Sequence, residues 1–96
     1  MPEIIGRGMT ADEKRVFVWD DGSITDGAGR GWTRSRLPLT WAFCVASEAC
    51  LFDSGEMPSL VRAAAKLARR GNMLPGVLRA MAARNAAKKG IVAREF

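Results

Sequence analysis

A chain of 96 residues with 15 Lys or Arg, 10 Asp or Glu and no His carries a formal net charge of +5. This length suits one domain with a modest core, so we expect residues 1–96 to form a single domain. No apolar run approaches the roughly 18 residues of a membrane span, and the start lacks the basic and apolar regions of a secretory signal. We therefore expect a cytoplasmic protein that makes no membrane contact.

The side chains that most often carry catalysis or bind metal are scarce. The chain has no His and no Tyr, which leaves carboxylates and lysines as general bases. Cys44 and Cys50 have no activating base at a suggestive spacing, and two thiols fall short of the roughly four ligands of a zinc site. We predict that both are reduced and buried. We therefore expect a protein that is not an enzyme and needs no cofactor, metal or small-molecule substrate.

The amino-terminal part of the chain, residues 1–37, is typical of a small antiparallel sheet. Glu3–Ile5 predicts a short strand that Gly6–Gly8 interrupts. Arg15–Trp19 is rich in branched and aromatic residues and is the clearest strand. Asp20–Ser23 contains the Asp-Gly pair of a tight hairpin, which predicts Ser23–Thr25 as the return strand.

A glycine-rich loop follows at residues 27–31. It lacks the Lys and Ser/Thr of a phosphate-binding P-loop and the spacing of a dinucleotide fingerprint, so we predict a mobile linker rather than a nucleotide site. The nearby acids Asp20, Asp21 and Asp26 do not have the spacing of a calcium loop. Turn formation explains these aspartates better.

A tryptophan alternates with arginines after this loop. If the segment is extended, Trp32, Arg34 and Arg36 share one face. An aromatic ring between arginines can stack on bases while the arginines bind phosphates. The alternative is that Trp32 covers the core beside two solvated arginines. With Arg30, these residues form a second basic patch.

Leu39–Phe52 fits two structures. As a helix it places Trp41, Cys44 and Val45 on one side. As two strands it needs a turn at Ala46–Ala49, which has no Gly, Asn or Pro. We predict a helix over about 39–52, packed on the sheet, and hence an α+β fold whose residues 38–96 are helical.

Two helices joined by a turn at residues 70–72 are expected at the carboxyl end, over about 58–70 and 73–89. Pro58 suits a first turn, and Gly71 and Gly90 suit helix ends. In the first helix one side is apolar and the other is basic, with Arg62, Lys66, Arg69 and Arg70. The predicted apolar side of the second helix comprises Leu74, Val77, Leu78 and Met81, with Ala83, Ala86 and Ala87 opposite.

The stripe of the second helix turns polar at Arg84, Asn85 and Lys88. We expect these last turns to project from the body or to press on another molecule, and a homodimer contact would also fit. From residue 57 onward the chain has nine Lys or Arg and one acid, a net +8, whereas residues 1–56 have six and nine, a net −3. A surface made for solubility alone would mix both signs. Two alternatives remain, namely an ordinary solvated basic surface on a helix pair and charges that hold the two halves of the molecule together.

This imbalance predicts that the helical hairpin docks a basic face on a polyanionic partner, which is nucleic acid or a nucleoprotein complex. The alternative is a small inhibitor or adaptor of the kind that phages or mobile elements encode, with anti-CRISPR proteins as the type case. It would act by protein–protein contact on an acidic host surface. The candidate partner-binding residues are Arg62, Lys66, Arg69, Arg70, Arg79, Arg84, Lys88, Lys89, Arg30, Trp32, Arg34 and Arg36.

Overall fold

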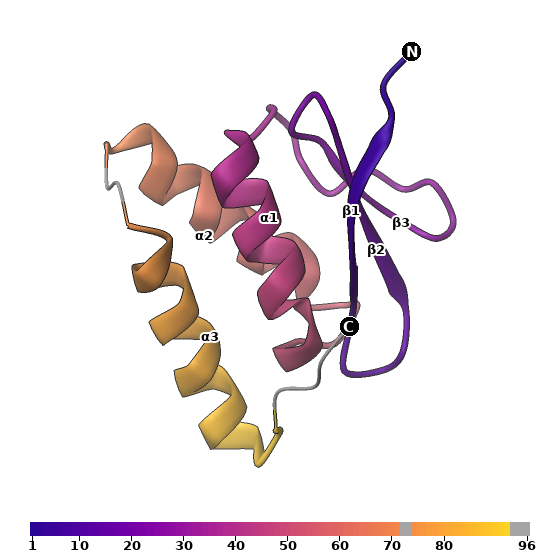
Figure 1. The fold of residues 1–96 in the computed structure, drawn as a ribbon. Coiled ribbons are helices and arrows are strands. Elements are labelled where there is room, and N and C mark those ends of the chain that lie inside the picture. Colours follow the sequence, from indigo (N-terminus) through magenta and orange to yellow (C-terminus); the bar gives the residue numbers. More distant parts are fainter. Residues whose placement is uncertain (72–73, 93–96) are drawn as a thin grey trace.

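An antiparallel sheet is followed by helices in the computed structural model, which describes residues 1–71 and 74–92 (Figure 1). The strands are neighbours in chain order: β1 (Ile4–Met9), β2 (Arg15–Trp19) and β3 (Ile24–Asp26). The helices are α1 (Leu39–Glu48), extended by the 3-10 turn η1 (Ala49–Leu51), α2 (Met57–Arg69) and α3 (Pro75–Lys89). The predicted α+β fold is confirmed.

Strand β1 runs through both of its glycines, so the predicted interruption at Gly6–Gly8 is wrong. The physical reason is the close approach of α1. A Cβ atom on Gly8 would lie 2.3 Å from the carbonyl oxygen of Ala46, and one on Gly6 would lie 2.7 Å from Cε1 of Phe43. Glycine here lets a helix pack directly on the strand backbone.

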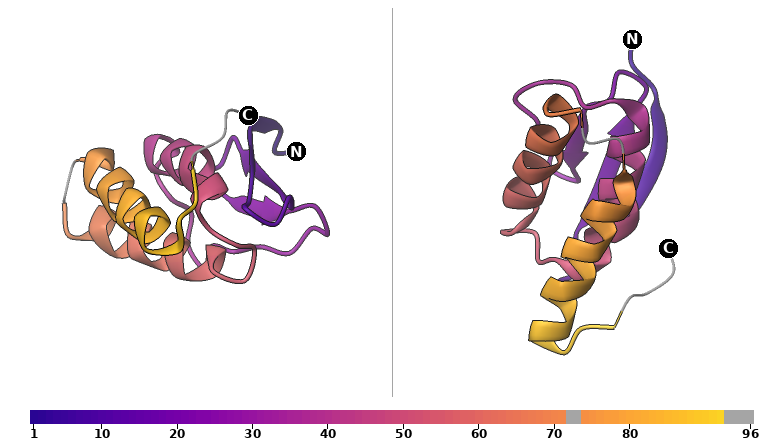
Figure 2. Two further views of the ribbon diagram at one scale, coloured as in Figure 1. Left: turned by 90° about the horizontal axis from the view of Figure 1, so that it is seen from below. Right: turned by 90° about the vertical axis from the view of Figure 1, so that its left-hand side faces the viewer.

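The sheet presents one face to the helices and leaves the other open (Figure 2). Val16 and Val18 of β2 are fully buried on the inner face, together with Ile24 of β3. Because side chains alternate along a strand, Arg7 and its cross-strand partner Phe17 lie on the outer face. That face carries no helix in the part of the chain that the structure describes.

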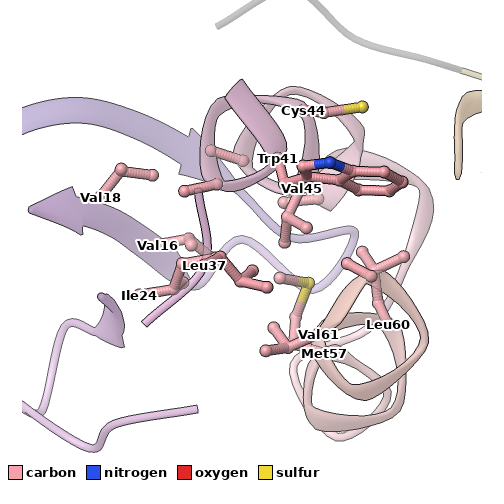
Figure 3. Packing of buried hydrophobic residues seen from close by; sticks show 14 of the residues in the cluster. Val16, Val18, Ile24, Leu37, Trp41, Cys44, Val45, Met57, Leu60 and Val61 are labelled. Carbon is pink, nitrogen blue, oxygen red and sulfur yellow. The ribbon is translucent and has the colours of Figure 1, made fainter. Parts of the chain in front are cut away.

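Helix α1 is the centre of the molecule. It packs on β1 and β2, and both α2 and α3 pack on it. Trp41 and Val45 are buried and lie between the sheet and Leu60 of α2 (Figure 3). The choice of a helix over two strands for Leu39–Phe52 is confirmed, because α1 and η1 together span 39–51.

Both cysteines are free and buried, as predicted. The Cys44 thiol donates to the carbonyl oxygen of Pro75 at 3.4 Å, which joins α1 to the start of α3. Burial raises the pKa of this thiol. Cys44 is therefore part of the helix packing.

Helix α2 buries the predicted side, and α3 does not. Leu60, Val61 and Ala64 of α2 are buried. In α3 the buried residues are Leu78, Ala82 and Ala86, whereas Leu74, Val77 and Met81 are 66%, 38% and 42% exposed. The predicted apolar side of α3 is therefore wrong except for Leu78, and so is the outward placement of Ala86. Small side chains at 82 and 86 let α3 pack closely on a cluster with Cys50 and Leu51.

Glycines end both carboxyl-terminal helices, as predicted. Gly71 follows α2 with a φ of 73°, and Gly90 caps α3 with a φ of 68°. These left-handed conformations favour glycine. Leu74 holds the position before α3, and the predicted turn residue Asn72 lies outside the described residues. None of the described helices is long and apolar enough to cross a membrane.

Candidate nucleic-acid interface

The outer side of α2 carries a ridge of cations, defined here as Arg62, Lys66, Arg69 and Arg70. All four are exposed; Arg62, Lys66 and Arg69 lie on the side of α2 away from the buried Leu60, and Arg70 follows as the C-cap of the helix. Among the residues that the structure describes, none of the four takes part in an ion pair or a side-chain hydrogen bond. The ridge therefore presents uncompensated positive charge to solvent.

Local interactions at both ends set the position of this helix. The Glu56 carboxylate accepts the backbone N–H of Asp53 at 2.8 Å, and Pro58 occupies the first turn. At the other end, Lys66 and Arg69 lie in the last turn, where the helix dipole favours positive charge. Two of the ridge cations thus also stabilise the helix that carries them.

Residues 31–37 lie along the same helix, held at two backbone anchors. The backbone N–H of Trp32 donates to the Ile24 carbonyl at 3.0 Å, and Gly31 pairs with Thr25 through a single β-bridge. The segment therefore begins as a short addition to the edge of β3. The Leu37 N–H donates to the Gly22 carbonyl at 3.3 Å. The segment is thereby fixed between the sheet and α2.

A crevice of about 500 Å³ lies between this segment and α2. A second hollow of about 130 Å³ adjoins it and shares Ser35, Ala65 and Arg69 with it. No acidic residue of the described chain lines either hollow. The crevice is lined by Gly31, Trp32, Thr33, Arg34, Ser35, Pro58, Val61, Arg62, Ala65 and Arg69. The predicted basic patch around Trp32 and the basic side of α2 therefore meet at one site.

Trp32 combines the two alternatives that its sequence context left open. It packs against the main buried cluster and also forms part of the crevice wall. The expectation of one extended face with Arg34 and Arg36 is wrong, because the chain bends at residues 34 and 35. Arg34 lies at the crevice, and Arg36 faces the adjoining hollow and pairs with Asp21 at 3.6 Å.

Three more of the predicted partner-binding cations are paired with acids of the first 56 residues. Arg30 lies 3.0 Å from Asp26, Arg79 lies 3.4 Å from Glu48, and Lys89 pairs with Glu56 and Asp53. The hydrogen bond from Lys89 lowers the pKa of Glu56. The Arg30 and Arg79 side chains of these pairs are exposed, so solvent screens their attraction to the acids. Each acid compensates the positive charge of its partner locally, whereas the cations of the ridge have no such partner among the described residues.

The glycine loop at 27–31 is organised by one carboxylate. Asp26 accepts hydrogen bonds from the backbone N–H groups of Ala28 and Arg30 and from the Arg30 side chain, at 2.9, 2.8 and 3.0 Å. Burial acts to raise the pKa of Asp26, but these hydrogen bonds outweigh it and lower the pKa. Turn formation by Asp21 and Asp26 is confirmed, since Asp21 likewise accepts the Ser23 N–H at 2.9 Å.

Replacing Asp26 by Asn should reduce stability at neutral pH by about 1 kcal/mol, which is about 5 °C in Tm. The folded-state pKa lies below the ordinary value of 3.8, so the stabilisation is complete above that pH and is lost as the pH falls through the folded-state pKa. Thermal melts between pH 2 and pH 7 should therefore show the two proteins converging at low pH. A constant difference across that range would contradict this role of the carboxylate.

Two more candidate cations lie across a different groove. Arg84 and Lys88 of α3, with Met81, face Leu60 and Ala63 of α2 over a groove of about 330 Å³. The Asn85 amide turns inward and donates to the Leu51 carbonyl at 3.1 Å. The last turns of α3 therefore pack with one side and leave Arg84 and Lys88 exposed.

Comparisons with protein-family models, with curated proteins and with solved structures find no match to this chain. Among the described residues, no group of three or more His, Cys, Asp or Glu is placed to hold a metal ion. The sequence prediction missed several crevice residues, namely Thr33, Ser35, Pro58, Val61 and Ala65. No local signal could have identified them, because the two walls come from separate segments of the chain.

Proposed function

We propose that this protein is a non-enzymatic binding protein that docks the ridge of α2 on the phosphates of nucleic acid, free or within a nucleoprotein complex. The observation that carries the proposal is that Arg62, Lys66, Arg69 and Arg70 are exposed and unpaired in the described chain, beside a crevice that no described acid lines. Binding such cations to phosphates releases condensed counterions, which is the main source of affinity for nucleic acid.

The geometry of the ridge suits a row of phosphates. From Arg62 to Arg69 the helix rises about 10 Å at 1.5 Å per residue, which covers about three phosphates at about 3.4 Å per nucleotide of one duplex strand. Arg34 and Arg69 approach the crevice from opposite walls. Their planar guanidinium groups can each hold a phosphate through two hydrogen bonds.

Binding rather than catalysis is also the function that the side-chain chemistry favours. The chain has no His and no Tyr, and the Cys44 thiol has a raised pKa that disfavours the reactive thiolate. We propose the cytoplasm as its compartment, which two free buried cysteines suit.

The proposal predicts a steep salt dependence. Four phosphate contacts should lower the affinity by about 50- to 150-fold between 50 and 200 mM salt, depending on whether the strand is single or double. Fluorescence anisotropy with labelled DNA and RNA, single-stranded and duplex, measures this slope. Absence of binding to all four ligands at 50 mM salt would eliminate the proposed function.

A second candidate function is favoured by an exposed apolar stripe formed by Val77 and Met81 of α3 and by Leu74 just before it. Apolar residues grouped on one helix side are typical of protein contacts. Arg84 and Lys88 lie next to Met81 and would suit an acidic surface. If the folded protein binds none of the four nucleic acids, that result favours this inhibitor or adaptor function. Besides an acidic host protein, the molecule that could cover the stripe is a second copy of the chain.

A further inference from the structure

We propose that the crevice between residues 31–35 and α2 receives an unpaired base, so that the nucleic acid bound by this protein is single-stranded. This inference rests on the proposed function and specifies its ligand. The ridge alone would suit any row of phosphates. The crevice beside it selects among nucleic acids, because its chemistry is not that of a phosphate site alone.

The crevice combines an apolar floor with a cationic rim. Pro58, Val61 and Ala65 of α2 provide the apolar contact, and Trp32 contributes an aromatic wall. The guanidinium-bearing residues at its rim are Arg34, Arg62 and Arg69. A nucleotide has the matching parts, since its base is a flat ring that stacks on aromatic residues and its phosphate binds arginine.

The size of the crevice fits this ligand. A volume of about 500 Å³ lies within the range of sites for small organic ligands, about 300–1,000 Å³. The adjoining hollow continues it along α2 toward Ala68. From Pro58 to Arg69 the helix rises about 16 Å, which is long enough for more than one nucleotide of an unpaired strand to lie along it. One base can enter the crevice while neighbouring phosphates follow the ridge.

A duplex cannot use this site without cost. Its bases are paired and stacked, and extruding one of them requires unstacking and unpairing. An unpaired strand presents its bases freely. The Trp32 indole N–H has no hydrogen-bond partner in the part of the chain that the structure describes, and its nitrogen is accessible to solvent. It can therefore donate to a bound base or sugar.

Two substitutions test the crevice from opposite walls. Trp32→Leu removes the stacking ring, and Ala65→Leu fills the crevice from α2 with a residue that helices accept well. Each should lower the affinity for a labelled ten-nucleotide strand by about 5- to 160-fold at 50 mM salt, the range expected when one base can no longer stack. The affinity for a ten-base-pair duplex should stay within about twofold. Trp32→Phe, which keeps an aromatic ring, should retain most of the single-strand affinity.

The outcomes separate this inference from the function on which it rests. Wild-type preference for the single strand, abolished in both Leu variants while each variant is still folded at the assay temperature, supports base insertion. Phe17→Leu on the outer face of the sheet is the matched aromatic control and should bind as the wild type does. Equal affinity for strand and duplex, or an equal decrease of both in the Leu variants, overturns base insertion and leaves phosphate docking intact. Failure of every nucleic acid to bind at 50 mM salt overturns both.

Discussion

Arg69→Glu combined with Arg70→Glu should lower the affinity for nucleic acid by about 100-fold or more at 0.1 M salt, because two phosphates are no longer neutralised and two repulsive charges are added. Both side chains are exposed at the carboxyl end of α2, so the fold should remain. The slope of log affinity against log salt should also become shallower, by about 0.7 to 0.9 for each phosphate that the variant leaves unneutralised. Anisotropy titrations at several salt concentrations measure both effects.

The control for this experiment makes the same change of net charge elsewhere. Arg7→Glu with Arg15→Glu reverses two cations of the sheet, and no described ion pair involves either residue. The affinity of that variant should fall only a few-fold, through the weaker overall field. An equally large decrease would place the interface on the open sheet face, beside Phe17. If the folded α2 variant binds nucleic acid normally, the ridge is only a solvated surface and not the binding site.

Gly22→Ala should destabilise the protein by about 3–5 kcal/mol, a large part of the stability of a small domain. Gly22 has a φ of 83°, which already disfavours any side chain. A Cβ atom there would also lie 1.9 Å from the carbonyl oxygen of Leu37, so the backbone must move. That movement would disturb the hydrogen bond between the Leu37 N–H and the Gly22 carbonyl, the second anchor of residues 31–37.

Gly29→Ala is a matched control for the steric part of this effect. Gly29 has a φ of 84°, nearly that of Gly22, but a Cβ atom on it would meet nothing within 4 Å. It should therefore cost only the conformational part, about 1 kcal/mol. Urea unfolding followed by circular dichroism measures both variants. Equal destabilisation by the two substitutions would show that the close approach of the Leu37 carbonyl to Gly22 adds no steric penalty.

The sequence predicted best those elements whose own residues decide their structure. Arg15–Trp19 forms β2 with the predicted bounds because branched and aromatic residues suit a half-buried strand. Helix α2 has strong helix formers, one apolar side and one basic side, so its orientation followed from its periodicity. The hairpin between β2 and β3 followed from Asp21 and Gly22.

Prediction failed where a distant segment decides the structure. Gly6 and Gly8 signal a break locally, but they continue β1 because α1 packs on them. In α3 alanines are spread around the helix, so the larger Leu74, Val77 and Met81 were assigned to the core. Packing against η1 instead selected the small residues Ala82 and Ala86. The crevice could not be predicted because its two walls come from different parts of the chain.

The anchors of residues 31–37 have a thermodynamic consequence for ligand capture. One end of this segment is hydrogen-bonded to the edge of β3 and the other to the turn before it, so the wall that carries Trp32 acquires its shape when the domain folds. An incoming strand then meets a preorganised surface and need not order a loop on arrival. Preorganisation of this kind lowers the entropic penalty of association, and it favours rapid capture in which the nucleic acid adjusts to the protein.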